Sequence, residues 1–216
     1  MVVVSSGNTG QTDNSITHPP ANDPFVITVG AMDDKGTADP SDDVVAPYSS
    51  YGTTNAGFSK PGLVARGTNI VSVIASSGEQ LVQPHPDHIV TVNGTSYFRM
   101  SGTSMSAAVA SGAAALLIQS NPSLTPDQIK YRLIATARPM SAPSAGAGEL
   151  DIYSAVHGTT TAGTNYGVQV STLLTTGSNP IAWNAVNWNA VNWKAVNWNV
   201  VNWNSIDWSQ QRFEWS

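Results

Sequence analysis

Short apolar runs alternate with polar turns in the first third of this chain. Residues 2–4 (VVV) are closed by Ser-Ser-Gly-Asn, and residues 25–31 (FVITVGA) form a second run. Continuous apolar runs of this length are typical of strands buried on both faces of a parallel sheet. Residues 63–75 (LVARGTNIVSVIA) predict further short strands around a glycine turn. Residues 33–43 are polar and rich in turn formers, so they predict a surface loop.

A hairpin and three helices are predicted next. Residues 81–99 contain strand-like pieces on either side of Asn93-Gly94, a strong hairpin signal. Residues 103–120 predict a helix that stops before Asn121-Pro122; it is apolar on nearly every face, so we expect it to be buried. The sequence TPDQ starts a second helix, with Thr125 as N-cap and Gln128 completing a capping box. Residues 146–148 and ELDIYSAV predict a turn and a short third helix.

This order of elements predicts the fold class. Strands interleaved with helices indicate an α/β layer structure. We expect a three-layer arrangement with a mostly parallel sheet and buried helices, formed by residues 1–158.

The character of the sequence changes after Gly158. Residues 159–180 are rich in Thr, Gly and Ser and predict a linker, and residues 181–216 form a tail of WNAVN repeats. Six tryptophans recur there every five residues from Trp183 to Trp208, with Trp215 out of phase. A period of five matches neither a helix nor a strand. The repeat therefore favours a turn-rich or short solenoid-like segment with a bend in each unit.

Composition narrows the function classes. Only 11% of residues are charged, against ~25% in an average globular protein, so the surface must carry Ser, Thr, Asn and Gly, as is common outside the cell. The net charge is −5 and no basic cluster exists, which argues against a nucleic-acid partner. There is no cysteine, so disulfides and thiolate sites are excluded.

Membrane and export signals are not predicted either. The apolar run at residues 105–118 falls short of the ~20 residues that a membrane span needs. MVVVSS has neither the basic region nor the apolar length of a secretory signal, and it resembles a strand entered midway.

Candidate chemistry appears at Gly102-Thr103-Ser104-Met105, where the long apolar helix begins. A helix N-terminus presents unpaired N–H groups and a partial positive charge, which stabilise developing negative charge. Ser104 can therefore be a nucleophile, with Gly102 allowing a substrate backbone to approach closely. The competing interpretation is that Thr103 or Ser104 only caps the helix.

Several stretches together resemble the subtilisin-like serine proteases. SGTSMSAAVASG resembles the nucleophile motif of that family, and VVVSSGNTG resembles its oxyanion strand. PANDPFVITVGA, YSSYGTTN, KPGLVARGTNIVS and GAGELDIYSAV resemble other family segments, in family order, over about residues 2–157. Ala108, Gly62 and Arg66 depart from the pattern, which usually has Pro, Asp and Pro there.

The resemblance implies an activity and its residues. It implies a serine endopeptidase acting on proteins or peptides, with Ser104 as nucleophile and Asn8 as the oxyanion asparagine. Ser5, Ser6 and Gly7 would line one wall of the specificity pocket. The family needs no cofactor for its chemistry, a structural calcium ion is not readable from the residues, no metal ligand is predicted, and secretion is expected by analogy.

The aspartate and histidine motifs of the family are absent from this sequence. We therefore expect the C-terminal portion of a catalytic domain, nearly inactive alone and poorly soluble. His157 lies in VHGTTTAG, which resembles the histidine motif but follows the serine and lacks its second histidine, so a catalytic role is not expected. His85 and His88 are expected to be solvated, and His18 to lie in a loop.

Two alternatives remain open at this point. The chain could be a pseudo-protease that keeps the serine without its base. It could also be a non-catalytic binding protein whose tryptophan repeat contacts a polysaccharide or a partner surface, since aromatic rings give large flat contact areas.

Overall fold

The computed structural model describes residues 1–10, 15–74, 82–166, 168, 175–176 and 179–180. The chain divides into two compact units, Met1–Gln169 and Val170–Ser216. Described residues of the second unit form one short antiparallel pair, β10 (Thr175–Thr176) and β11 (Asn179–Pro180). The tryptophan repeat predicted at residues 181–216 lies outside the described residues.

The central sheet of the first unit is mostly parallel. Its strands are β1 (Val3–Ser5), β2 (Ile27–Asp33), β3 (Val44–Val45) and β6 (Leu63–Arg66). Both β1 and β6 pair with β2 in parallel, whereas β3 pairs antiparallel with the end of β2. Strands are thus confirmed within the predicted runs at residues 2–4 and 25–31, and β6 occupies the start of the run at residues 63–75.

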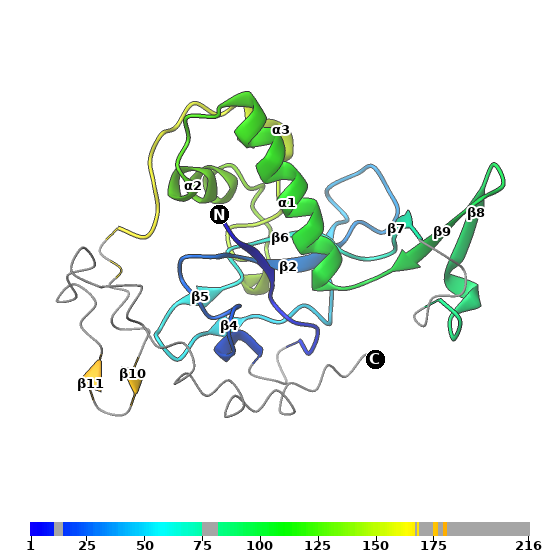
Figure 1. The fold of residues 1–216 in the computed structure, drawn as a ribbon, viewed down its shortest axis with the longest axis horizontal. Helices are drawn as coiled ribbons and strands as arrows, with labels where there is room; N and C mark the ends of the chain where they lie inside the picture. Colours follow the sequence, from blue (N-terminus) through cyan, green and yellow to red (C-terminus); the bar gives the residue numbers. More distant parts are fainter. Residues whose placement is uncertain (11–14, 75–81, 167, 169–174, 177–178, 181–216) are drawn as a thin grey trace, which may run out of the picture. The chain divides into compact units, whose positions relative to one another are not determined.

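Helices lie over this sheet (Figure 1). They are α1 (Thr103–Ser120), α2 (Pro126–Ala135) and α3 (Ile152–His157). Helix α1 packs on β1, β2 and β6, and it also contacts α2 and α3. Short 3-10 turns occur at η1 (Ser15–Thr17), η2 (Pro86–His88) and η3 (Pro143–Ala145). The predicted α/β class is confirmed at this level.

Alternating side chains on β6 serve two separate cores. Leu63 and Ala65 point toward the helices and join a cluster that includes Leu117 and Leu133. Val64, between them, packs with Met32 and Ala145 on the opposite face. Because the two faces are both covered, an uninterrupted apolar run is needed here, which explains the sequence pattern.

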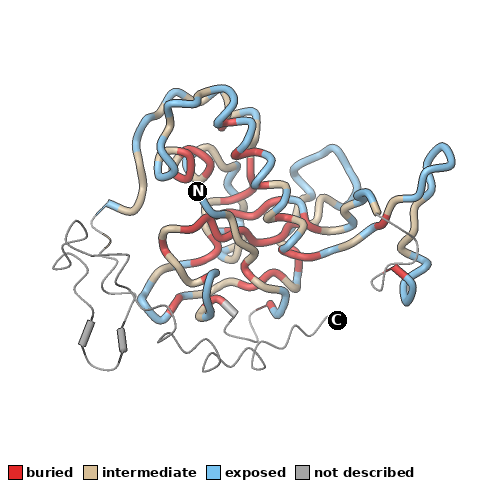
Figure 2. Tube along the Cα trace, viewed as in Figure 1, coloured by how far each residue is buried: buried red, intermediate tan, exposed pale blue. Residues whose placement is uncertain are grey.

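The prediction that the helix over residues 103–120 is buried on nearly every face is wrong. Its buried positions are confined to one side: Thr103, Ser106, Ala110, Ala113, Ala114 and Leu117. On the other side Leu116 is 49% and Ile118 42% exposed. Figure 2 shows the two sides of α1 as red and blue stretches along the tube. The sheet covers only one face, and an apolar composition alone does not supply a second partner.

The second helix forms as predicted. The Thr125 side chain accepts from the Gln128 amide, and the Gln128 side chain accepts from the Thr125 amide, so the capping box is complete. Asp151 caps α3 in a simpler way, by accepting from the Ser154 amide.

Residues 159–166 are held against α2. Arg132, only 1% exposed, donates from Nε and Nη2 to the carbonyl of Thr160. Gln128 donates to the Thr161 carbonyl at 2.8 Å, and Asn165 donates to Asp127 at 2.7 Å. The first compact unit accordingly runs to Gln169, beyond the end at residue 158 that composition suggests.

Two smaller sheets complete the first unit. One is the pair β4 (Gly52–Thr53) and β5 (Ser59–Lys60). The other, in the order β7-β9-β8, forms an arm from β7 (Ile70–Val73), β8 (Ile89–Val92) and β9 (Thr95–Met100) that projects beside the start of α1 (Figure 1). The predicted Asn93-Gly94 hairpin turn joins β8 to β9, with φ of 50° and 78°.

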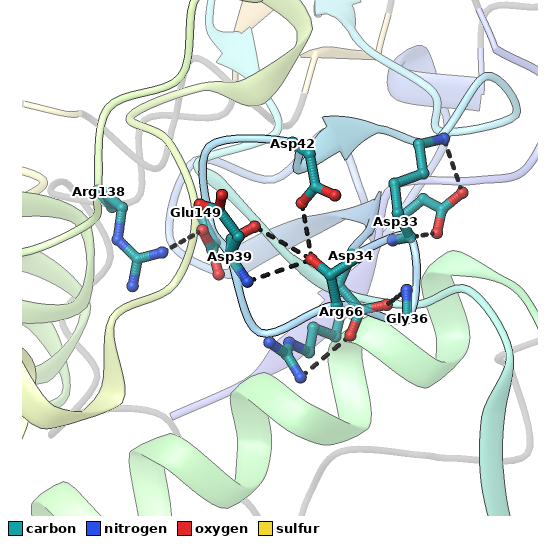
Figure 3. A network of polar contacts seen from close by, with 10 residues as sticks. Asp33, Asp34, Gly36, Asp39, Asp42, Arg66, Arg138 and Glu149 are labelled. Carbon is teal, nitrogen blue, oxygen red and sulfur yellow. Dashed lines mark hydrogen bonds and ion pairs between the residues drawn. The ribbon is translucent and has the colours of Figure 1, made fainter.

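Of the segment 33–43 that is predicted as a surface loop, Asp33 ends β2 and residues 34–43 form a largely exposed loop, with ion pairs around it (Figure 3). Arg66 pairs with Asp34 at 3.0 Å, and Arg138 pairs with Glu149 at 2.9 Å. Burial raises the pKa of Glu149, against the opposing effect of the Arg138 guanidinium. Among the described residues, none of the helices has the length and apolar character to cross a membrane.

Candidate active site

Ser104 lies in the first turn of α1, directly after β9 leads into Gly102. Gly102 is the N-cap residue and contributes no side chain. Ser104 is exposed, and the first turn contains no acidic residue that would neutralise the positive end of the helix dipole. The sequence thus places a hydroxyl at the electropositive end of an 18-residue helix.

Asn8 approaches this helix end from the loop that follows β1. Its Oδ1 accepts hydrogen bonds from the amide and the hydroxyl of Thr103, both at 2.9 Å. The Thr103 hydroxyl in turn accepts from the Gly7 amide at 3.2 Å. These contacts bridge residues that lie about 95 positions apart in the chain.

The interpretation of Thr103 or Ser104 as an ordinary helix cap is therefore wrong. No side chain of the helix caps its own N-terminus. Instead, the carboxamide of Asn8, in the loop after β1, accepts the hydrogen bond of the Thr103 N–H. Thr103 itself is 1% exposed and fully engaged, which leaves Ser104 as the hydroxyl that faces solvent.

The same contacts orient the Asn8 carboxamide. Because Oδ1 is turned toward Thr103, the Nδ2 group points elsewhere, and a Cβ atom built on Gly102 would lie 3.3 Å from Nδ2. Within the described residues, no hydrogen bond engages Nδ2, and Asn8 is exposed. A donor pair is thus available beside Ser104: the Asn8 amide group and the backbone N–H at the helix start.

Gly67, in the turn after β6, contacts the start of α1 through its backbone carbonyl. The Gly102 amide donates to the Gly67 carbonyl at 2.8 Å. A Cβ on Gly67 would lie 2.1 Å from Ser106 Oγ and 2.9 Å from the Gly102 carbonyl oxygen. Only glycine permits this approach between the turn after β6 and α1.

The residues predicted to line a specificity pocket lie at the end of β1 and directly after it, next to the site. Ser5 is the last residue of β1 and is partly buried, as is Gly7. Ser6 is 1% exposed, and its amide donates to the Val29 carbonyl at 2.9 Å. Ser5 and Gly7 thus lie partly open beside Asn8, while Ser6 belongs to the sheet.

The four histidines lie elsewhere. His157 lines a hollow with Leu116 and Ser120 at the C-terminal end of α1, the end opposite Ser104, and Ser120 lies about 24 Å along the helix from Ser104. His85 stacks on His88 at 5.3 Å on the arm. His18 is exposed in the loop after η1. In the described part of the chain, no hydrogen bond or ion pair joins a histidine to Ser104.

A metal centre is not evident in the described residues, because no group of three or more His, Cys, Asp or Glu side chains converges there. The buried ammonium group of Lys60 is hydrogen-bonded to oxygen atoms. Lys60 Nζ donates to the Asp23 carbonyl at 2.6 Å and to Thr28 Oγ1 at 2.9 Å. Burial, together with the nearby Lys130, lowers the pKa of Lys60 to about 8.

The structure therefore places an exposed serine at a helix N-terminus, with the Asn8 carboxamide held beside it by Thr103. The family model described as "Subtilase family" matches residues 1–155. The chain therefore belongs to that family of serine endopeptidases. This confirms the resemblance that the sequence motifs indicate.

Individual relatives cover the same region. The chain is 43% identical over 133 residues to Serine protease AprX of Bacillus subtilis, covering 62% of this chain and 29% of AprX. It is 34% identical over 137 residues to Fervidolysin of Fervidobacterium pennivorans, covering 63% of this chain and 18% of that protein. This chain therefore spans less than a third of either relative.

Solved structures show the same fold. The crystal structure of fervidolysin, described as a keratinolytic enzyme related to subtilisin, has a TM-score of 0.59 and 28% identity, covering 74% of this chain and 23% of that one. The crystal structure of MycP1 with its N-terminal propeptide removed has a TM-score of 0.51 and 29% identity, and the match covers 74% of this chain and 51% of that one.

Two residues contribute to this site in ways that the sequence motifs do not reveal. Thr103 appears in the motif only as a candidate cap, although its hydroxyl orients Asn8. Tyr48 appears in the family-like stretch YSSYGTTN without a role, although its hydroxyl donates to the Gly67 carbonyl at 3.0 Å. Nothing in a local pattern shows contacts between such distant segments.

Proposed function

We propose that this chain carries the nucleophile and oxyanion half of a serine endopeptidase. In this reaction Ser104 Oγ attacks the scissile carbonyl carbon and transfers its proton to a base. The tetrahedral intermediate then expels the amine, which takes that proton, and water later releases the acyl group from Ser104. The hydrogen bonds from Thr103 to Asn8 Oδ1, at 2.9 Å, carry the proposal, because they orient Nδ2 as a fixed donor.

Asn8 Nδ2 and the Ser104 amide would together bind the developing oxyanion. Loss of one such donor costs about 10²–10³-fold in rate, a figure that comes from subtilisin, a member of this family. Ser5, Ser6 and Gly7 would form one wall of the pocket for the residue before the cut. The substrate class is protein or peptide.

We infer that the base and its orienting carboxylate come from polypeptide outside this chain. The placement of the four histidines away from Ser104 supports this inference. So does the coverage of AprX and fervidolysin, of which this chain spans 29% and 18%. Without a base, a serine hydroxyl is a poor nucleophile at neutral pH.

The outer face of α1 is the surface on which we expect that polypeptide to pack. Ser104, Ala108, Ser111, Ala115 and Ile118 are all exposed and follow each other at helical spacing. A segment lying along this face would end beside Ser104. It would also complete the three-layer arrangement by extending the sheet beyond β1, which pairs only with β2 among the described strands.

A fluorophosphonate probe tests the proposal. The chain alone should label weakly, and co-expression with the part of AprX that precedes its matched region should raise labelling. Ser104→Ala should abolish that labelling and Ser111→Ala, on the same face, should not.

Each of the other outcomes contradicts a different part of the proposed function. Strong labelling of the chain alone would show that it contains its own base. Labelling that persists in Ser104→Ala would reject the nucleophile. No labelling in any combination would favour a pseudo-protease.

The tryptophan repeat favours a second candidate function, binding of a polysaccharide such as a cell wall. Its six tryptophans in fixed register would offer flat aromatic surfaces. The full chain should then sediment with insoluble polysaccharide, whereas a chain ending at residue 168 should stay in solution. An extracellular setting fits this and the low charge content of 11%.

A further inference from the structure

Tyr48 connects two loops that meet at the candidate active site. Its carbonyl accepts from the Gly10 amide at 2.7 Å, in the loop that carries Asn8. Its hydroxyl donates to the Gly67 carbonyl at 3.0 Å and lies 3.0 Å from Thr68 Oγ1. One residue therefore links the turn after β6 to the loop after β1.

These contacts close a ring of hydrogen bonds. The Gly67 carbonyl that receives the Tyr48 hydroxyl also receives the Gly102 amide at 2.8 Å. From Gly102 the chain continues to Thr103, whose amide and hydroxyl bind Asn8. The ring thus runs from Asn8 through α1 and the turn after β6 to Tyr48 and back to the Asn8 loop.

The Tyr48 side chain is suited to a fixed position. The residue is partly buried, and burial raises the pKa of its phenol, so the hydroxyl remains a donor through the neutral range. A phenol that donates to a carbonyl already bound by an N–H aligns that carbonyl in two directions.

We propose that Tyr48 is a positioning residue that sets the separation between the Asn8 carboxamide and Ser104. This inference rests on the proposed function of those two groups. An oxyanion hole works only while its donors keep their geometry, since a shift of a fraction of an ångström weakens both hydrogen bonds.

The backbone around Tyr48 is held independently of its hydroxyl. The Ser50 amide donates to the Gly7 carbonyl at 3.0 Å, and Ser50 Oγ accepts from the Thr9 amide at 3.1 Å. Ser49 Oγ accepts from the Ala31 amide at 2.9 Å. Removing the Tyr48 hydroxyl therefore breaks the link to Gly67 and leaves residues 49–50 in place.

Hydrogen exchange of the full chain tests the ring directly. In Tyr48→Phe the Gly102 amide should exchange about fivefold faster, the factor that corresponds to one lost hydrogen bond of average strength. The melting temperature should stay close to that of the unmodified chain. Tyr51→Phe is the matched control, because no hydrogen bond of the Tyr51 hydroxyl occurs among the described residues, and it should leave exchange unchanged.

A catalytic readout separates positioning from simple packing. In the complemented enzyme, Tyr48→Phe should lower kcat by about fivefold with little change in KM, because the oxyanion forms only after substrate binding. Unchanged exchange at Gly102, or an equal loss in Tyr51→Phe, would overturn the proposal. So would a rise in KM at constant kcat.

Failure of the proposed function gives a different result. In that case no combination labels with the probe, while the exchange difference between Tyr48→Phe and Tyr51→Phe persists. The ring would then be real and Tyr48 would hold a site without protease chemistry, which rejects its positioning role in catalysis.

Discussion

Single residues in this domain take their roles from contacts that lie far away in the chain. Thr103 is the clearest case. Its position before Ser104 suggests a helix cap, yet its hydroxyl donates to Asn8 and accepts from Gly7. Threonine supplies a donor and an acceptor in one small buried group. A local motif can show that such a residue is present. Only the contact between the loop after β1 and the start of α1 shows that Thr103 orients Asn8.

Buried ammonium groups form a second residue-scale feature. Lys60 is 8% and Lys130 7% exposed. Lys60 binds the Asp23 carbonyl, and Lys130 donates to the Pro24 carbonyl and to Asn165. The pKa of both amines is lowered chiefly by burial. These amines tie the loop before β2 to α2 and β5.

Lys60 should make the domain more stable as the pH rises from about 8 to about 10. Its folded pKa of about 8 lies below its unfolded value, so in this window the unfolded state binds more protons and the free energy of unfolding increases with pH. Urea unfolding at several pH values measures this slope. Lys60→Met should unfold more easily at every pH and should lack that part of the slope; an identical slope in both proteins would contradict the prediction.

At the scale of elements, α2 needs the segment that follows Gly158. Arg132 lies in the middle of the helix and is buried, and its described partner is the carbonyl of Thr160. A buried guanidinium without acceptors is strongly unfavourable. Composition predicts a linker over residues 159–180, because Thr, Gly and Ser are frequent in linkers. Within it, however, the Thr160 carbonyl accepts from Arg132 and the Asn165 side chain accepts from Lys130.

A chain that ends at residue 158 should lose about 2 kcal/mol of unfolding free energy, since it removes the Thr160 carbonyl that accepts from Arg132. A chain that ends at residue 168 keeps every contact described between this segment and α2 and should unfold like the full chain. Chemical denaturation followed by circular dichroism compares the three. Equal stability of the 158 and 168 chains would show that the segment is only a linker.

At the scale of the whole molecule, the exposed side of α1 carries large apolar side chains. Leu116 and Ile118 are both exposed, Ile118 on the outer face of α1 and Leu116 in the hollow beside His157, and Val2 next to β1 is 56% exposed. Exposed apolar area beside an unpaired strand edge promotes association. Under the proposed function, this apolar surface is where further polypeptide would pack.

The chain alone should therefore self-associate as its concentration rises. Leu116→Glu combined with Ile118→Glu should reduce association in analytical ultracentrifugation and change the unfolding free energy by less than about 0.5 kcal/mol, because exposed sites tolerate charge. Leu117→Glu, at a position with 0% exposure, should unfold the domain. Association that persists in the double variant would place the contact surface elsewhere.

Several features of this architecture can be predicted from the local sequence. The apolar runs, the Asn93-Gly94 turn and the Thr125 capping box depend on neighbours within a few residues, so backbone preference and burial periodicity suffice to predict them. The family motifs likewise indicate Ser104 and Asn8 as a pair.

Tertiary structure alone decided which face of α1 is covered, how Asn8 is oriented and where the first compact unit ends. These features depend on contacts between segments that are tens of residues apart, such as Asn8 with Thr103 and Arg132 with Thr160. An apolar helix has no preferred partner of its own, and a carboxamide has no preferred orientation. Both acquire one only when the folded chain brings a specific donor, acceptor or surface against them.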